Sequence, residues 1–295
     1  MSMMSSSNRS APIRLPQLLV FLIATTLVGS ILSLPYLILV RIIPVVQLSA
    51  LMAVLLGIGS GLIAALLCKL LKLGNTPTVM IAGAVSALLF QYVKWAMFSS
   101  YVYTLWYIGE DQASYLSMLP GFLLNPVALV DAIIEINQYG TWSMSDSGAS
   151  MNGIMLALIW LAEFAIIFAI YLRMLSGQAA KPFIAGENQW AIQQKGNIYL
   201  RNFPEALTSQ MISSNPEILL PNVVPASEIG IEPHIEIELF HSQDYAENYI
   251  NVSSISYVRQ NGQTKKQEKK IARNLTVNRE FISALLTSAR MSFET

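Results

Sequence analysis

The stretch TVMIAGAVSALLFQYVKWAMFSSYVYTLWYI, residues 78–108, decides the class of fold to which this chain belongs. It carries one charged side chain, Lys94, which lies near its middle. A helix needs about 20 predominantly apolar residues to cross the hydrocarbon core of a membrane. The stretch therefore predicts a membrane-spanning helix with an ammonium group inside it.

Three further segments, residues 15–40, 45–67 and 153–172, are long, apolar and free of charge except for Glu163. The first is too long for the core of a signal peptide and lacks a small-residue cleavage site, so we expect it to remain as an anchor. Pro35 is expected to kink or end this span. The predicted fold class is thus an α-helical membrane bundle of four transmembrane helices.

A second, soluble domain follows the bundle. The whole chain is 54% hydrophobic and only 12% charged, with a mean hydropathy of +0.49, whereas soluble domains contain about 25% charged residues. Of its 36 charged side chains, 23 lie after position 174. This asymmetry predicts that residues 176–295 form a separate domain in water.

The basic residues near the span ends predict the orientation. One side of the membrane would hold six of them and the other side only Arg41, a pattern that indicates a bacterial-type inner membrane protein with both termini in the cytoplasm. The six are Arg9, Arg14, Lys69, Lys72, Arg173 and Lys181. Residues 1–14 would then be a disordered cytoplasmic N-terminus, and residues 109–152 an outer loop.

The outer loop contains a helix signature at about residues 126–138. Asn125 is placed to cap the helix, Pro126 occupies its first position, and Gly140 follows its end. The segment is largely apolar, which favours a helix that lies at the membrane interface or packs over the bundle. The alternative is a lid or a surface that docks a partner.

Small residues predict where helices approach closely. Gly57 and Gly61 are four apart in the second span, and Gly83 lies in the third. Such spacing allows backbone contact between membrane helices. We favour packing within the bundle, and the alternative is the seam of a homo-oligomer.

Lys94 and Glu163 form the most specific candidate site. A charge at the centre of a bilayer costs about 2.5 to 3.5 kcal/mol on insertion scales. Lys94 is 14 residues from Ile108 and 16 from Thr78, too far for its side chain to reach either surface. Glu163 lies at matching depth in the fourth span, so the two are predicted to form an ion pair, and Gln91 shares the face of Lys94.

The pair has a structural and a functional interpretation. The structural interpretation, which we favour, is a clasp that fixes the register of two helices. The functional alternative is a relay for protons or ions. The chain has no metalloprotease motif and no histidine in its spans, so no catalytic, metal-binding or cofactor-binding residue is expected. A serine–lysine dyad of Lys94 with Ser86, Ser99 or Ser100 is the least favoured possibility.

The C-terminal domain is predicted to be a small α+β domain with an antiparallel sheet. Residues up to about 227 suggest loops with short helices. The alternation of HIEIELF, residues 234–240, predicts a half-buried strand, and a hairpin of residues 249–260 and 263–271 follows around Asn261 and Gly262. Asn278 then caps a final helix.

Four lysines of the returning strand are candidates for contact with anionic lipid. They are Lys265, Lys266, Lys269 and Lys270. The domain holds nearly equal numbers of acidic and basic residues and no interleaved aromatic residues, so no nucleic acid is expected as a partner. A solvated edge strand protected by lysines is the simpler interpretation.

These observations favour an integral membrane protein that acts without catalysis, as an anchor, an assembly factor or a signal-coupling subunit. Its expected partners are the lipid bilayer and another membrane or cytoplasmic protein, or further copies of the chain. The alternative is a component of a channel or transporter that uses Lys94 and Glu163 in the path.

Overall fold

The computed structural model describes residues 15–42, 46–107, 117–140, 142–143, 150–201, 207–225, 229–260 and 263–289. The chain divides between Ala180 and Lys181 into two compact units, one made of helices and one built around a sheet. The predicted N-terminal segment 1–14 and the hairpin turn at Asn261 and Gly262 lie outside the described residues.

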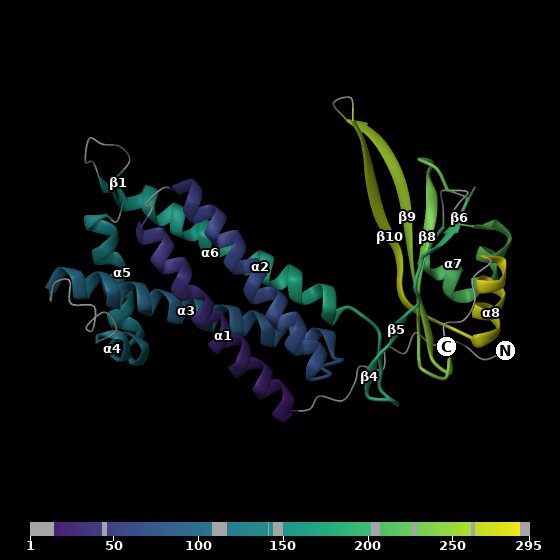
Figure 1. The fold of residues 1–295 in the computed structure, drawn as a ribbon, viewed down its shortest axis with the longest axis horizontal. Helices are drawn as coiled ribbons and strands as arrows, with labels where there is room; N and C mark the ends of the chain where they lie inside the picture. Colours follow the sequence, from purple (N-terminus) through teal and green to yellow (C-terminus); the bar gives the residue numbers. More distant parts are fainter. Residues whose placement is uncertain are drawn as a thin grey trace. The chain divides into compact units, whose positions relative to one another are not determined.

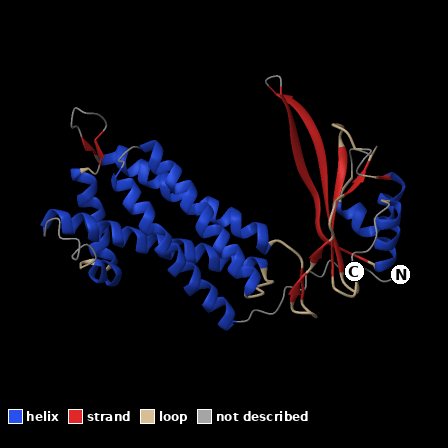
Figure 2. Ribbon diagram, viewed as in Figure 1, coloured by secondary structure: helices blue, strands red, loops and turns tan. Residues whose placement is uncertain are grey.

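Within the described residues, the helical unit has four helices that are long and apolar enough to cross a membrane (Figures 1 and 2). They are α1 (Leu15–Ile42), α2 (Val46–Leu70), α3 (Thr76–Tyr107) and α6 (Gly153–Ala179). The helix α2 packs along α6, and α1 packs against both α2 and α3. Their outward-facing side chains are mostly leucine, isoleucine and valine, as expected for a surface that does not face water.

Three of these helices end later than the predicted spans: α1 at Ile42, α2 at Leu70 and α6 at Ala179. The helix α1 continues through Pro35 to Ile42 instead of ending there, since a proline removes only one hydrogen bond and neighbouring helices can compensate for it. The helix α6 continues to Ala179, beyond residue 172, because residues 176–179 carry no charge and Ala180 N–H still donates to the Ser176 carbonyl at 3.0 Å.

The three glycines predicted to pack helices lie where α6 comes closest. A β-carbon added to Gly61 would lie 2.8 Å from Met174 Cβ and 3.0 Å from the Tyr171 backbone. One added to Gly57 would lie 3.0 Å from Ile170 Cβ. Gly83 of α3 also faces α6, at the side chain of Leu175. In this structure the three glycines serve contacts within one chain.

A short helical hairpin connects α3 to α6. It consists of α4 (Leu119–Leu124) and α5 (Pro126–Tyr139), both packed against α3. The predicted caps of α5 are confirmed: the Asn125 side chain accepts from Ala128 N–H, and Gly140 follows the last residue. The strands β1 (Trp142–Ser143) and β2 (Ser150–Met151) pair before α6 begins.

The second unit is an antiparallel sheet with the strand order β10-β9-β8-β6-β7, and β5 also pairs with β8. Its long strands are β8 (His234–His241), β9 (Asn248–Gln260) and β10 (Gln263–Val277). The short ones are β5 (Ile192–Gln193), β6 (Ile198–Leu200) and β7 (Val223–Val224), and β3 (Phe183–Ile184) pairs separately with β4 (Gln189–Trp190).

One face of the sheet is covered by α7 (Ser209–Ser214), the 3-10 helix η2 (Pro216–Asn222) and α8 (Arg279–Ser288). Figure 1 shows α7 and α8 on the same side of the strands. The predicted alternation of β8 is confirmed, because Ile235, Ile237 and Leu239 all lie in the core beneath these helices. Asn278 caps α8 as predicted, accepting from Phe281 N–H at 2.7 Å.

The prediction for the first part of this unit was incomplete. Residues 176–227 were expected to form loops with short helices, but they also supply strands β3 to β7. Each of these strands has only two or three residues, too few for a repeat of hydrophobicity to appear in the sequence. Their partners determine them: β6 exists because Ile198 and Leu200 pair with Ile237 and Ile235 of β8.

Candidate functional site

The predicted intramembrane charges both lie inside the helical unit. Lys94 of α3 is 4% exposed and Glu163 of α6 is 6% exposed. The Lys94 ammonium lies 4.9 Å from the centre of the Tyr36 ring and 5.6 Å from that of the Trp95 ring. At such distances the negative faces of aromatic rings attract a cation. The ammonium is thus held partly by aromatic rings.

Tyr36 of α1 joins the two charged groups. Its hydroxyl donates a hydrogen bond of 2.8 Å to Glu163 Oε2, while its ring faces Lys94. Among the described residues, no ion pair connects Lys94 directly to Glu163. The direct ion pair therefore stays a prediction. The structure adds Tyr36, from a third helix, as a residue that contacts both charged groups.

Gln91 lies one helical turn before Lys94 and also reaches α6. Its amide nitrogen donates to the carbonyl of Phe164, the residue after Glu163, at 3.5 Å. Two buried oxygens of this group, Gln91 Oε1 and Glu163 Oε1, have no hydrogen-bond partner within the described chain. A buried polar atom without a partner costs free energy, and such sites often hold an ordered water.

A second polar layer lies between the same three helices, about two helical turns nearer to the start of α3. Thr25 of α1 and Ser86 of α3 share a hydrogen bond of 2.6 Å, and the Tyr171 hydroxyl of α6 donates to Ser86 at 3.5 Å. Ser86 is eight residues from Lys94, about 12 Å along the helix axis. That separation rules out Ser86 as the partner of Lys94 in a serine–lysine dyad.

An apolar layer separates the two polar layers. Phe90 is fully buried, and its ring lies so close to Gly29 that a β-carbon there would be 2.7 Å from it. The Tyr171 ring packs on Phe90 with centroids 5.8 Å apart. On the other side of Lys94, Trp95 and Trp160 pack edge to face at 4.9 Å. The charged group is therefore enclosed by aromatic side chains along the helix direction.

Metal-binding, cysteine and serine side chains bear on the catalytic alternatives named above. No group of three or more histidine, cysteine, aspartate or glutamate side chains that could hold a metal ion occurs in the described ranges. The only cysteine, Cys68, is buried. Ser99 is buried too, and no base that could activate its hydroxyl donates to or accepts from it.

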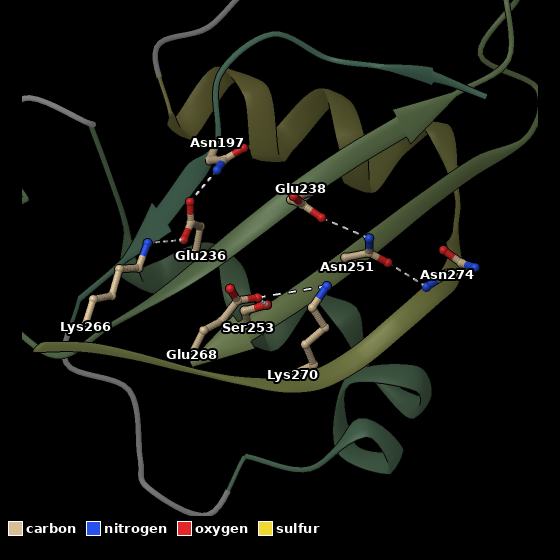
Figure 3. A network of polar contacts seen from close by, with 9 residues as sticks. All are labelled: Asn197, Glu236, Glu238, Asn251, Ser253, Lys266, Glu268, Lys270 and Asn274. Carbon is tan, nitrogen blue, oxygen red and sulfur yellow. Dashed lines mark hydrogen bonds and ion pairs between the residues drawn. The ribbon is translucent and has the colours of Figure 1, made fainter. Parts of the chain in front are cut away.

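The lysines of β10 lie on two faces of the strand, as strand alternation requires. Figure 3 shows Lys266 pointing toward Glu236, at 3.2 Å, and Lys270 toward Glu268, at 4.0 Å. The hydrogen bond to Glu236 raises the pKa of Lys266. Lys265 and Lys269 lie on the opposite face and contact neither carboxylate.

The same open face of the sheet carries a wider polar network (Figure 3). The Asn197 amide donates to Glu236, and Ser253 donates to Glu268 at 3.0 Å. The Asn251 amide donates to Glu238 at 3.0 Å and its oxygen accepts from Asn274 N–H. These bonds connect the segment of β6 with β8, β9 and β10. Lys266 and Lys270, two of the four candidates for lipid contact, join the network through Glu236 and Glu268.

Sequence reasoning missed Tyr36 and the layer of Thr25, Ser86 and Tyr171. One signal was present: Tyr36 is the only tyrosine among residues 15–42, where Phe21 is the only other aromatic residue. The sequence did not indicate which neighbouring helix its hydroxyl would meet. Comparison with known proteins does not assign the site, since no family model, no curated protein and no solved structure matches this chain.

Proposed function

We propose that this chain is an integral membrane protein of the bacterial inner-membrane type, which acts without catalysis as an anchor, an assembly factor or a signal-coupling subunit. The four long apolar helices support a multi-pass protein. The excess of basic residues at one set of span ends supports cytoplasmic termini. In this view the helical unit is a scaffold that holds the sheet unit at the membrane surface.

The contact of Tyr36 with both Lys94 and Glu163 is the single observation that carries the proposal. It connects α1, α3 and α6 through groups that are costly to bury and therefore depend on one another. Phe90 and Gly29 close the site on one side, and Trp95 and Trp160 on the other. A closed polar contact between three helices fixes their arrangement.

The direct test is to purify the full chain in mild detergent and identify the proteins that elute with it. A foreign membrane or cytoplasmic protein in fixed stoichiometry is the expected result. Lys265→Ala, which changes an exposed side chain of the sheet unit, and Leu62→Ala, which changes an outward-facing residue of α2, are matched variants that would indicate which unit binds it. A chain that elutes alone as a monomer would contradict the proposal.

A component of a channel or transporter is the second candidate, and the two unpartnered oxygens of Gln91 and Glu163 favour it. Buried acceptors beside an ammonium could hold water and exchange protons. This function predicts a homo-oligomer and a proton or ion flux in proteoliposomes that Glu163→Gln abolishes while the protein still folds. Wild-type flux no greater than that of empty liposomes would rule this candidate out.

A further inference from the structure

The hairpin of α4 and α5 exposes a stripe of apolar side chains. One face of α5 is buried against the rest of the helical unit through Leu129, Ala132 and Ile136. A second face of α5 remains open, and it carries Val127, Val130 and Ile134, which are 69%, 53% and 51% exposed. These three residues are three and four apart, which places them in one line, and the exposed Asp131 borders that line. Leu124, at the end of α4, is 85% exposed and adds to this apolar stripe.

The turn between α4 and α5 lies alongside the middle of α3, not beyond its end. The Tyr92 hydroxyl donates to the carbonyls of Phe122 and Leu123, at 2.8 and 3.1 Å. Tyr92 is only two residues from Lys94. The Phe122 ring also packs against Tyr103, with centroids 5.6 Å apart. The turn therefore lies beside the part of α3 between Tyr92 and Tyr103.

The backbone of this turn has the hydrogen bonds that a non-helical segment needs in hydrocarbon. The last carbonyls of a helix lack partners within it, and Tyr92 supplies a donor to two of them in α4. Asn125 N–H donates to the Gly121 carbonyl at 3.0 Å, and the Asn125 side chain caps α5. Bilayers tolerate irregular backbone only where such partners exist.

The opposite end of α5 has the features of a membrane surface. Trp106 and Tyr139 pack edge to face at 5.4 Å, and both are partly exposed. Tryptophan and tyrosine gather at the boundary between lipid and water. Glu135 lies at this end, where Tyr103 and Tyr107 donate to its carboxylate. Asn137 also binds the carbonyl of Gly153, where α6 begins, at 3.0 Å.

We infer that α4 and α5 form a helical hairpin that enters the bilayer from the end where α3 finishes and α6 starts, and returns without crossing it. The stripe from Leu124 to Ile134 contacts the acyl chains of that leaflet, while Trp106 and Tyr139 mark its surface. The hairpin packs against α3, and the long helices also expose mostly leucine, isoleucine and valine, which identifies lipid as the occupant of the stripe. The inference rests on the proposed membrane embedding.

The test uses the full chain in lipid nanodiscs, with a fluorophore on single introduced cysteines. Cys68 stays in place because it is fully buried, and the unsubstituted chain measures its residual labelling. The test positions are Val127→Cys and Val130→Cys. Leu62→Cys, on the outward face of α2, is the lipid control, and Ser283→Cys, an exposed position of α8 in the sheet unit, is the water control. Each is exposed to brominated phospholipid and, separately, to aqueous iodide.

The hairpin predicts that positions 127 and 130 follow position 62, with several-fold stronger quenching by brominated lipid than at position 283. If position 62 is quenched by lipid but 127 and 130 are quenched by iodide, the hairpin lies in water and this inference alone fails. Quenching of 127 and 130 by neither agent means that protein covers the stripe, which also overturns it. If position 62 is not quenched by lipid, the proposed membrane embedding fails first.

Discussion

Lys94 and Lys266 both lie near a glutamate, but in different surroundings. On the sheet, Lys266 contacts Glu236 directly at 3.2 Å while about half of its side chain remains in solvent. In the helical unit, Lys94 is almost completely buried and reaches Glu163 through Tyr36. Water and salt weaken the first pair, whereas the second has no solvent to replace a lost partner. The extent of burial, more than the distance between the charges, should therefore determine how much each pair contributes to the free energy of unfolding.

The largest expected effect comes from removing one buried charge. Glu163→Leu leaves the Lys94 ammonium without its countercharge, so the free energy of unfolding should fall by about 3–5 kcal/mol. Thermal unfolding in mild detergent, followed by tryptophan fluorescence, measures it. Asp131→Leu removes an exposed acid of the same unit and is the matched control. Equal stability of the two variants would contradict the comparison.

Tyr36→Phe should have an intermediate effect. It keeps the ring that faces Lys94 but leaves Glu163 Oε2 without its donor, at a cost of about 1–3 kcal/mol. Tyr107→Phe is the control, because its hydroxyl makes a longer bond of 3.4 Å at an exposed position. The same unfolding measurement applies. If Tyr36→Phe is as stable as the control, the hydroxyl does not hold the carboxylate.

A pair of glycines on α2 tests the packing that brings the charges together. Gly61→Ala should destabilise by about 1 kcal/mol or more, because the new methyl group meets Tyr171 backbone at 3.0 Å. Gly59→Ala meets nothing closer than Leu32 at 3.8 Å, so it should stabilise α2 by up to about 1 kcal/mol. The unfolding temperature is expected to fall for Gly61→Ala and to rise for Gly59→Ala. A rise for both variants would mean that α2 does not approach α6 this closely.

The smallest effect is expected on the sheet. Lys266→Ala should cost less than about 1 kcal/mol at low salt and nothing measurable at high salt. Because contact with Glu236 raises the pKa of Lys266, the contribution is complete at neutral pH. This stabilising contribution is lost as the pH rises above the ordinary pKa of a lysine and through the raised pKa of Lys266. Lys265→Ala, on the other face, is the control in chemical unfolding titrations, and a larger loss there would reverse the assignment of faces.

Counting residues along the helices predicted that Lys94 and Glu163 lie at a matching level, and both residues contact Tyr36 in the structure. Such counting could not reveal Tyr36, since residue counts give no information about the direction in which a side chain points around the helix axis. The faces of the four lysines follow from strand alternation, but their carboxylate partners depend on how β8, β9 and β10 align. The register of β9 and β10 runs without a break from Gln263, opposite Gln260, to Lys270, opposite Ser253, and shifts only beyond Lys270.

The same distinction applies to the fold. Strand β8 and helix α8 were predictable from their hydrophobic repeats, and the hairpin of β9 and β10 from Asn261 and Gly262. Strand β10 was expected to end at residue 271 but continues to Val277. The short strands β5 to β7 were not predictable, because each is created by its neighbour in the sheet. The position of α4 beside α3 depends on one tyrosine hydroxyl, Tyr92, whose partners lie about 30 residues away in sequence.

The most direct test of the account is a double-mutant cycle on Lys94→Leu and Glu163→Leu, measured by unfolding in mild detergent. If Tyr36, Lys94 and Glu163 form a clasp, each single variant is strongly destabilised and the double variant regains stability, with a coupling energy of about 2–3 kcal/mol. If the losses in the free energy of unfolding of the two single variants add in the double variant, with a coupling energy below about 0.5 kcal/mol, the two charges do not depend on each other. The interpretation of the site as a clasp is then wrong.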